Sequence, residues 1–557
     1  MAGTRGGRSH LARQGAISHP VTTRVTVLLD IFGFLSVLLR GLQMAFEALT
    51  VGGVIFLTGI ARAVRDEALP RLLTRWLIWA ALALAGTQIC AVTVNSAILV
   101  GSTDMGLDEL IGAGFWISGM LVVAGTVAVG TLVRTRLARI AAPTACAMIL
   151  AGSVMASHSV ARVEHRYVLV ALTLAHHLAS AAWIGGLPYL LLALRHSQDT
   201  RTAGAIVHRF SGMAMASVAV LAGAGAALAL VYTGSISAIT GTTYGAMLLS
   251  KVVLTVLLLV FGALNFTIVR AIRGGASPVL LPLRRFTEVE VGVGMTVLLA
   301  AASLTSTPPA IDVLAGRVTA HEIVQRMKPR WPRLETPPVS ELSPATPLEP
   351  NWDSRSTASF VPGQLVHPNT PADIAWLEYN HHWAGLVMLA IGMLAFLAGR
   401  FVWARHWPLA FLGLAVFLLI RADSENWPLG PRGFWESFQV AEVAQHRLFV
   451  LLIVAFAVFE WAVQNGRLPQ RRAGLVFPLV CGAGGALLLT HSHSLGNVKE
   501  EFLAELSHIP LALMAVIAGW FRWLEIRLPV DQTPRLPRVW PVCFTLIGVV
   551  LILYRES

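Results

Sequence analysis

The chain has 557 residues, of which 55% are hydrophobic and 13% are charged, and its mean hydropathy is +0.67. A soluble domain carries about 25% charged residues, so this composition excludes a soluble enzyme, a nucleic-acid-binding domain and a disordered protein, and predicts a protein of the lipid bilayer. The net charge of +12 has an ordinary source in such a protein, which is arginine in cytoplasmic loops. The four cysteines lie far apart and form no CxxC motif, so we expect neither a disulfide framework nor a thiolate metal site; they are Cys90, Cys146, Cys481 and Cys543.

Apolar runs long enough to cross a bilayer recur along the whole chain and predict an all-α bundle of about 14 membrane-spanning helices. Eight are expected near residues 41–60, 76–98, 111–133, 140–157, 167–194, 211–233, 246–270 and 286–305. Six more are expected near 383–402, 407–421, 445–464, 473–490, 507–524 and 539–554. Residues 25–39 are too short for a separate span, and they either lie along the interface or extend the first helix.

The composition divides the chain into four parts. Residues 1–30 are rich in Arg and Gly and are expected to form a disordered tail without a signal peptide. Residues 31–310 are expected to form an eight-helix membrane domain, and residues 381–557 a six-helix domain. The polar segment 311–380 between them is rich in proline, which predicts a long extended linker rather than a packed domain.

Arginines gather in alternate loops and orient the predicted bundle. These loops lie at 62–75, 134–139, 195–209, 270–285, 400–405, 467–472 and 522–538. The intervening loops are poor in basic residues, and residues 99–110 and 234–245 contain no Lys or Arg. The positive-inside rule therefore places the Arg-rich loops in the cytoplasm and the long linker on the outer side.

Most of the 17 histidines lie at the outer ends of the expected helices. Imidazole is the commonest metal ligand, and the methionine thioether favours Cu(I), so we predict copper ligands at this face. The candidates are His158, His176, His177, His381, His382, His446, His491, His493, His508 and Met155. His176 and His177 lie about 15 Å along their helix at 1.5 Å per residue, a depth at which ionisable groups are usually functional. Each candidate also has a structural alternative, such as a hydrogen bond across the bundle or a place at the interface.

No sequence pattern supports catalysis. The chain contains no Walker A motif, no DKTGT-like phosphorylation site, no GxSxG and no HExxH. We therefore expect neither an enzyme nor an ATP-driven pump.

Several stretches resemble the CopD family of bacterial copper-resistance membrane proteins. They are Ser157-His158-Ser159, the run from Ala175-His176-His177 to Trp183-Ile184-Gly185-Gly186, Arg209-Phe210-Ser211, residues 241–245 with Lys251 and Asn265, and residues 304–310. The similarity is good over residues 157–310 and looser over 40–156. The C-terminal half looks like an extension found on some members of that family.

This resemblance implies a multi-pass protein of the bacterial inner membrane that acts in copper homeostasis. It implies that copper ions move from the periplasm to the cytoplasm through His and Met sites without ATP. It also implies a separate periplasmic partner, a CopC-like copper chaperone, because the linker is too short and too rich in proline to be a fused β-sandwich. The resemblance transfers a ligand role only to His158 and to the His176/His177 position.

Two other functions stay open. A b-type haem electron-transfer protein would use histidines on neighbouring helices as axial ligands, among them His381, His382, His446, His491, His493 and His508. A sensor or assembly factor would hold copper at the periplasmic face without transporting it.

Overall fold

The computed structural model describes most of the chain. The described residues are 20–63, 68–103, 106–135, 138–197, 200–273, 280–313, 316–342, 370–424, 426–439, 441–490, 499–529 and 536–556. Within them, 12 helices are long and apolar enough to cross a membrane, and two shorter apolar helices cover Ile140–Met155 and Leu536–Ile552. These helices follow the predicted spans in order along the chain, so the all-helical membrane fold is confirmed.

The first half of the chain contains the helices before the linker. They are α1 (Pro20–Ile55), α2 (Ala68–Thr103), α3 (Leu107–Ile111), α4 (Gly114–Leu132), α5 (Ala138–Met155), α6 (His158–Ala161), α7 (Arg166–Ser180), α8 (Leu187–His196), α9 (Thr200–Thr233), α10 (Ile236–Thr240), α11 (Thr243–Arg273) and α12 (Leu280–Ser306). Two π-helical turns occur here: Phe56–Ile60 (η1) follows α1, and Ala181–Gly185 (η3) joins α7 to α8.

The start of α1 decides between the two alternatives for residues 25–39. Because α1 is continuous from Pro20 to Ile55, this segment extends the first helix. The tail expected over residues 1–30 overlaps α1 at residues 20–30, and residues 1–19 lie outside the described residues. A helix continues beyond its apolar window at little cost where its polar end reaches water, so hydropathy alone underestimates its length.

The linker packs where the structure describes it, in residues 316–342. It contains one α-helix, α13 (Ala320–Met327), with a capping box between Thr319 and Glu322, and a 3-10 turn at Val339–Glu341. The Arg421 guanidinium donates to the Thr336 hydroxyl at 2.7 Å, and the Trp383 indole donates to the Leu334 carbonyl at 3.3 Å. This part of the linker is thus fastened to the C-terminal half, whereas residues 343–369 lie outside the described part.

The second half of the chain contains the helices after the linker. They are α14 (Pro371–Leu397), α15 (Ala410–Arg421), α16 (Ala441–Gln464), α17 (Gln470–Ala473), α18 (Val476–Thr490), α19 (Lys499–Arg527) and α20 (Val539–Ile552). The expected boundary at residue 381 falls inside α14, which begins earlier because Thr370 and Asp373 form a capping box ahead of the apolar run.

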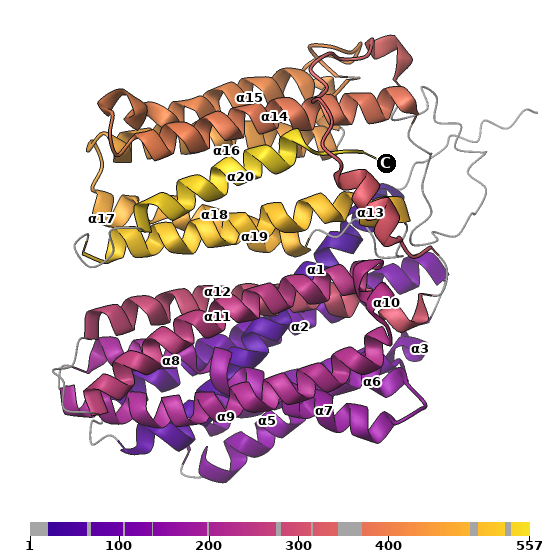
Figure 1. Cartoon of the computed structure of the whole chain (residues 1–557). Helices are drawn as coiled ribbons and strands as arrows, with labels where there is room; N and C mark the ends of the chain where they lie inside the picture. Colours follow the sequence, from indigo (N-terminus) through magenta and orange to yellow (C-terminus); the bar gives the residue numbers. More distant parts are fainter. Residues whose placement is uncertain are drawn as a thin grey trace, which may run out of the picture.

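The two halves form two stacked layers of helices (Figure 1). The strongest pairings lie within each half, such as α4 with α5, α11 with α12, and α14 with α20. Helix α12 contacts both α18 and α19, so it is the main connection between the layers.

Candidate functional site

A cavity of about 520 Å³ lies inside the first half. Its walls come from α1, α6, α7, η3, α9, α11 and α12, and most of its lining is apolar. His158, His176 and His177 line it together with Glu47 and Lys251. Three predicted ligands from two helices therefore meet at one cavity, which we call the imidazole cavity.

The backbones of α1 and η3 approach closely at this cavity because both carry glycine. A Cβ added to Gly185 would lie 1.9 Å from the Ala48 carbonyl oxygen, and one added to Gly52 would lie 2.3 Å from the Ala181 carbonyl oxygen. A π-helical turn such as η3 inserts an extra residue into a helix and is often found at functional sites. The close approach brings Glu47 of α1 beside His177 of α7.

Glu47 and His177 form the central polar contact of the cavity. The His177 Nδ1 atom lies 3.2 Å from Glu47 Oε1. Glu47 is only 4% exposed, and its second oxygen, Oε2, has no hydrogen-bond partner among the described residues. One carboxylate oxygen can therefore orient the imidazole while the other coordinates a bound cation.

His176 faces the same cavity from the next position of α7. Its Nδ1 atom is buried and finds no partner in the described parts of the chain. The ring packs on α9 at Gly225, where an added Cβ would lie 3.3 Å from the ring Cε1 atom. Adjacent helical residues diverge by about 100°, yet both imidazoles line the wall because the cavity extends around this side of α7.

His158 lines the cavity at the start of α6. The next residue, Ser159, ties α6 to its neighbours, with its hydroxyl 2.6 Å from Thr173 Oγ1 and 2.9 Å from Tyr232 Oη. The His158 Nε2 atom is buried with no partner in the described structure. Burial lowers the pKa of His158 below its usual value, and the charges of Arg40 and Arg162 act in the same direction, against a backbone hydrogen bond with Thr305. The imidazole is therefore uncharged at neutral pH and can donate a lone pair to a metal ion.

These donors do not form a closed metal cage. Within the described ranges, no three side chains of His, Cys, Asp or Glu come close enough to hold one metal ion together. The imidazole cavity instead offers separate donors at successive places along its wall.

The remaining predicted ligands lie elsewhere. Met155 is 45% exposed and does not line the imidazole cavity. His381 and His508 meet in the second half, with ring centroids 6.5 Å apart, and the His381 ring stacks on Tyr554 at 3.9 Å. His446 pairs with Asp423 at 2.9 Å, and His491 and His493 lie outside the described residues.

His382 has a structural explanation. It is fully buried, and its Nδ1 accepts a hydrogen bond from the Arg333 backbone N–H at 2.7 Å. Its Nε2 lies 2.9 Å from the Tyr554 carbonyl oxygen and donates to it. Both ring nitrogens are thus used to join α14 to the linker and to the C-terminal segment, which leaves none for a metal.

The predicted ligand set left out Glu47, which is the carboxylate of the site. The sequence does contain a signal, because Arg40, Gln43 and Glu47 recur at helical spacing in an apolar stretch and so share one face of α1. That signal marks a polar face but does not say which helix it meets.

Known proteins resemble parts of this chain. Residues 204–304 match the model of the family CopD, copper resistance protein D. The matched segment covers most of α9, α11 and α12, so it includes Gly225, Tyr244 and Lys251 of the cavity wall, and the three histidines precede it.

The chain is also similar to the copper transport protein CutJ of Bacillus subtilis (strain 168), with 28% identity over 222 residues. This alignment covers 38% of the chain and 40% of CutJ, so the chain spans about two fifths of the length of the curated relative that it matches. No solved structure matches it. Residues 204–304 thus match the model of the CopD family of copper resistance proteins, in a membrane protein of many helices, and the resemblance to that family is confirmed.

Proposed function

We propose that this protein carries copper ions across the bacterial inner membrane, from the periplasm to the cytoplasm, through the imidazole cavity and without ATP. The observation behind the proposal is a set of buried atoms around one cavity that find no partner among the described residues, which are His158 Nε2, His176 Nδ1 and Glu47 Oε2. A buried polar atom without a partner is costly, and a bound metal ion would supply the missing interaction.

The spacing of the donors favours passage over storage. A transported ion must bind well enough to enter and weakly enough to leave, which requires several modest sites rather than one tight cage. Arg40 and Lys251 also line the cavity, so copper is held by coordination to imidazole rather than by net negative charge. The membrane potential drives cation entry with about 2.3 kcal/mol per charge per 100 mV.

We extend the proposal to the number of membrane spans and their orientation. The two short apolar helices are taken as spans, which gives eight before the linker and six after it, all in the inner membrane. The Arg-rich loops face the cytoplasm, so His158 and the linker face the periplasm. A separate CopC-like chaperone would deliver copper at that side.

Copper accumulation in cells tests the proposal. Cells expressing the chain are expected to accumulate more copper than cells with an empty vector, and His158→Ala, His176→Ala and His177→Ala are each expected to lose most of this increase. Met155→Ala is the matched control, because Met155 is exposed and away from the cavity. All variants are compared at equal amounts in the membrane.

Two results would contradict the proposal. A decrease in cellular copper would reverse the direction of transport, and unchanged copper in every strain would exclude transport. A Soret band in the purified protein would instead support the haem alternative.

A further inference from the structure

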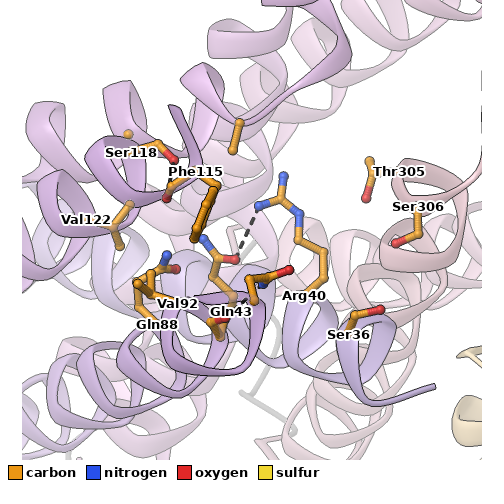
Figure 2. Close-up of a pocket in the computed structure, with 14 residues that line it drawn as sticks. Ser36, Arg40, Gln43, Gln88, Val92, Phe115, Ser118, Val122, Thr305 and Ser306 are labelled. Carbon is orange, nitrogen blue, oxygen red and sulfur yellow. Dashed lines mark hydrogen bonds between the residues drawn. The ribbon is translucent and has the colours of Figure 1, made fainter. Parts of the chain in front are cut away.

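A second cavity, of about 240 Å³, lies on the other side of α1. Residues of α1, α2, α4, α5 and α12 line it, and we call it the amide cavity after Gln43, Gln88 and Asn95 in its wall. Figure 2 shows the Gln43 side chain between the Arg40 guanidinium and Gln88. Arg40 lines both cavities, and no histidine lines this one.

Arg40 is the only charged side chain among the described residues that line the amide cavity. Its guanidinium donates to Gln43 Oε1 at 3.2 Å, and this leaves further N–H groups for a ligand. A guanidinium in an uncharged wall selects an anionic group, and its planar fork matches a carboxylate.

The hydroxyl groups of the wall act as acceptors, because their protons are already used. Those of Ser36, Ser118, Thr305 and Ser306 donate to backbone carbonyls of their own helices, at 2.9, 3.1, 3.1 and 2.8 Å. The Asn95 amide likewise donates to the Ala91 carbonyl at 2.8 Å. Apart from Arg40 and the amide N–H groups of Gln43, Gln88 and Asn95, the polar groups of the wall present oxygen lone pairs.

Gln88 adds a buried acceptor without a partner. It is only 6% exposed, and its Oε1 finds no donor in the described structure. Its Nε2 packs on Gly119, where an added Cβ would lie 2.8 Å away. Burying an acceptor without a donor is unfavourable, so an occupant of this cavity gains by bringing a donor to Gln88.

We infer that the amide cavity binds a small zwitterion, an α-amino carboxylate. The carboxylate pairs with Arg40, and the ammonium group donates to Gln88 Oε1 and to the hydroxyl oxygens. A simple carboxylate would leave the acceptors unpaired, and a simple amine would lie beside the Arg40 cation. The ligand of this site needs no metal, although Arg40 also lines the imidazole cavity.

Ligand titration of the purified full-length protein in detergent tests this inference. Glycine is expected to bind and to raise the melting temperature, whereas acetate and methylamine at the same concentrations are expected to do neither, since each supplies half of the recognised groups. Glycolate carries a hydroxyl in place of the ammonium group and is expected to bind more weakly than glycine. Equal or tighter binding of glycolate would overturn the assignment of an ammonium group.

Variants separate binding from folding. Arg40→Gln and Gln88→Leu are each expected to weaken glycine binding at least about tenfold, or 1.4 kcal/mol. Arg166→Gln, at an exposed position of α7, is the neutral control and is expected to retain binding. Folded wild-type protein that does not bind glycine, or Gln88→Leu that binds it as well as wild type, would overturn the inference. Neither outcome would affect copper uptake.

Discussion

The His176 ring has room in the imidazole cavity because α9 carries Gly225 at the point of contact. A methyl group there would lie 3.3 Å from the ring Cε1 atom and 3.6 Å from the unpartnered Nδ1 atom. We expect Gly225→Ala to shift the ring and to cover this nitrogen, and so to lower copper uptake roughly tenfold, which corresponds to about 1.4 kcal/mol. Uptake of copper into vesicles measures the effect.

Gly223→Ala is the matched control on the same helix, because a Cβ at Gly223 would meet nothing within 4 Å among the described residues. Equal uptake by the two variants would show that His176 does not bind the transported ion.

The Glu47 carboxylate permits a second test at single-residue scale. Glu47→Gln keeps the shape of the side chain but removes the charge beside His177. Loss of a carboxylate that orients a metal-binding imidazole typically costs about 10–100-fold in metal affinity, and we expect a loss of this size in a Cu(I) competition titration. Glu164→Gln, at an exposed position before α7, should bind copper as wild type does. Unchanged affinity in Glu47→Gln would remove Glu47 from the site.

The sequence predicted the histidines of the imidazole cavity but not the residues that they contact on other helices. His158, His176 and His177 were predicted ligands, and the structure brings them to one cavity. The pairing of His177 with Glu47 joins positions 130 residues apart, and a contact of this kind depends on where two helices cross. Hydropathy and spacing describe one helix at a time, so they do not show this pairing or the role of Gly225.

At the scale of elements, the crossing of α1 with η3 positions the site. Gly185→Ala would place a methyl group 1.9 Å from the Ala48 carbonyl oxygen, so the two backbones must separate. Overpacking of this kind costs about 1–3 kcal/mol, and we expect a lower melting temperature in detergent. Gly59→Ala, at an open and exposed position of η1, should melt at or slightly above the wild-type temperature. Equal melting of the two variants would mean that the crossing tolerates a wider separation.

Most elements could be predicted, because an apolar run of about 20 residues is a strong signal of a membrane helix. The interruption of the expected span 167–194 could not. The expected span consists of α7 and α8, and the π-helical turn η3 interrupts it between them. One inserted residue hardly changes the hydropathy of a window, although it redirects every side chain that follows.

At the scale of the whole molecule, α12 holds the two layers of helices together. Near its C-terminal end, the Ser303 hydroxyl donates to the Leu489 carbonyl of α18 at 2.6 Å. Toward its other end, the buried Glu288 carboxylate accepts from the Arg195 guanidinium of α8 at 2.8 Å. It also accepts from Arg527 and from the Trp523 indole of α19, at 3.0 and 2.8 Å. One carboxylate thus joins both halves.

Glu288→Ala is therefore expected to weaken the contact between the halves. Removing one partner of a buried ion pair costs about 3–5 kcal/mol, and the lower end applies here because the Arg195 side chain is 51% exposed. We expect a clear fall in the melting temperature of the full-length protein. Ser303→Ala should cost less, about 1 kcal/mol, because it removes one neutral hydrogen bond.

The salt dependence of the melting temperature distinguishes this buried cluster from an ordinary surface ion pair. Surface ion pairs are screened at high ionic strength, whereas buried pairs are screened much less. The difference in melting temperature between wild type and Glu288→Ala should therefore persist in 1 M NaCl. Glu164→Ala, which removes an exposed carboxylate, should show no difference at either salt concentration. If high salt abolishes the effect of Glu288→Ala, the cluster acts only at the surface, and the packing of α12 against α18 and α19 holds the halves together without it.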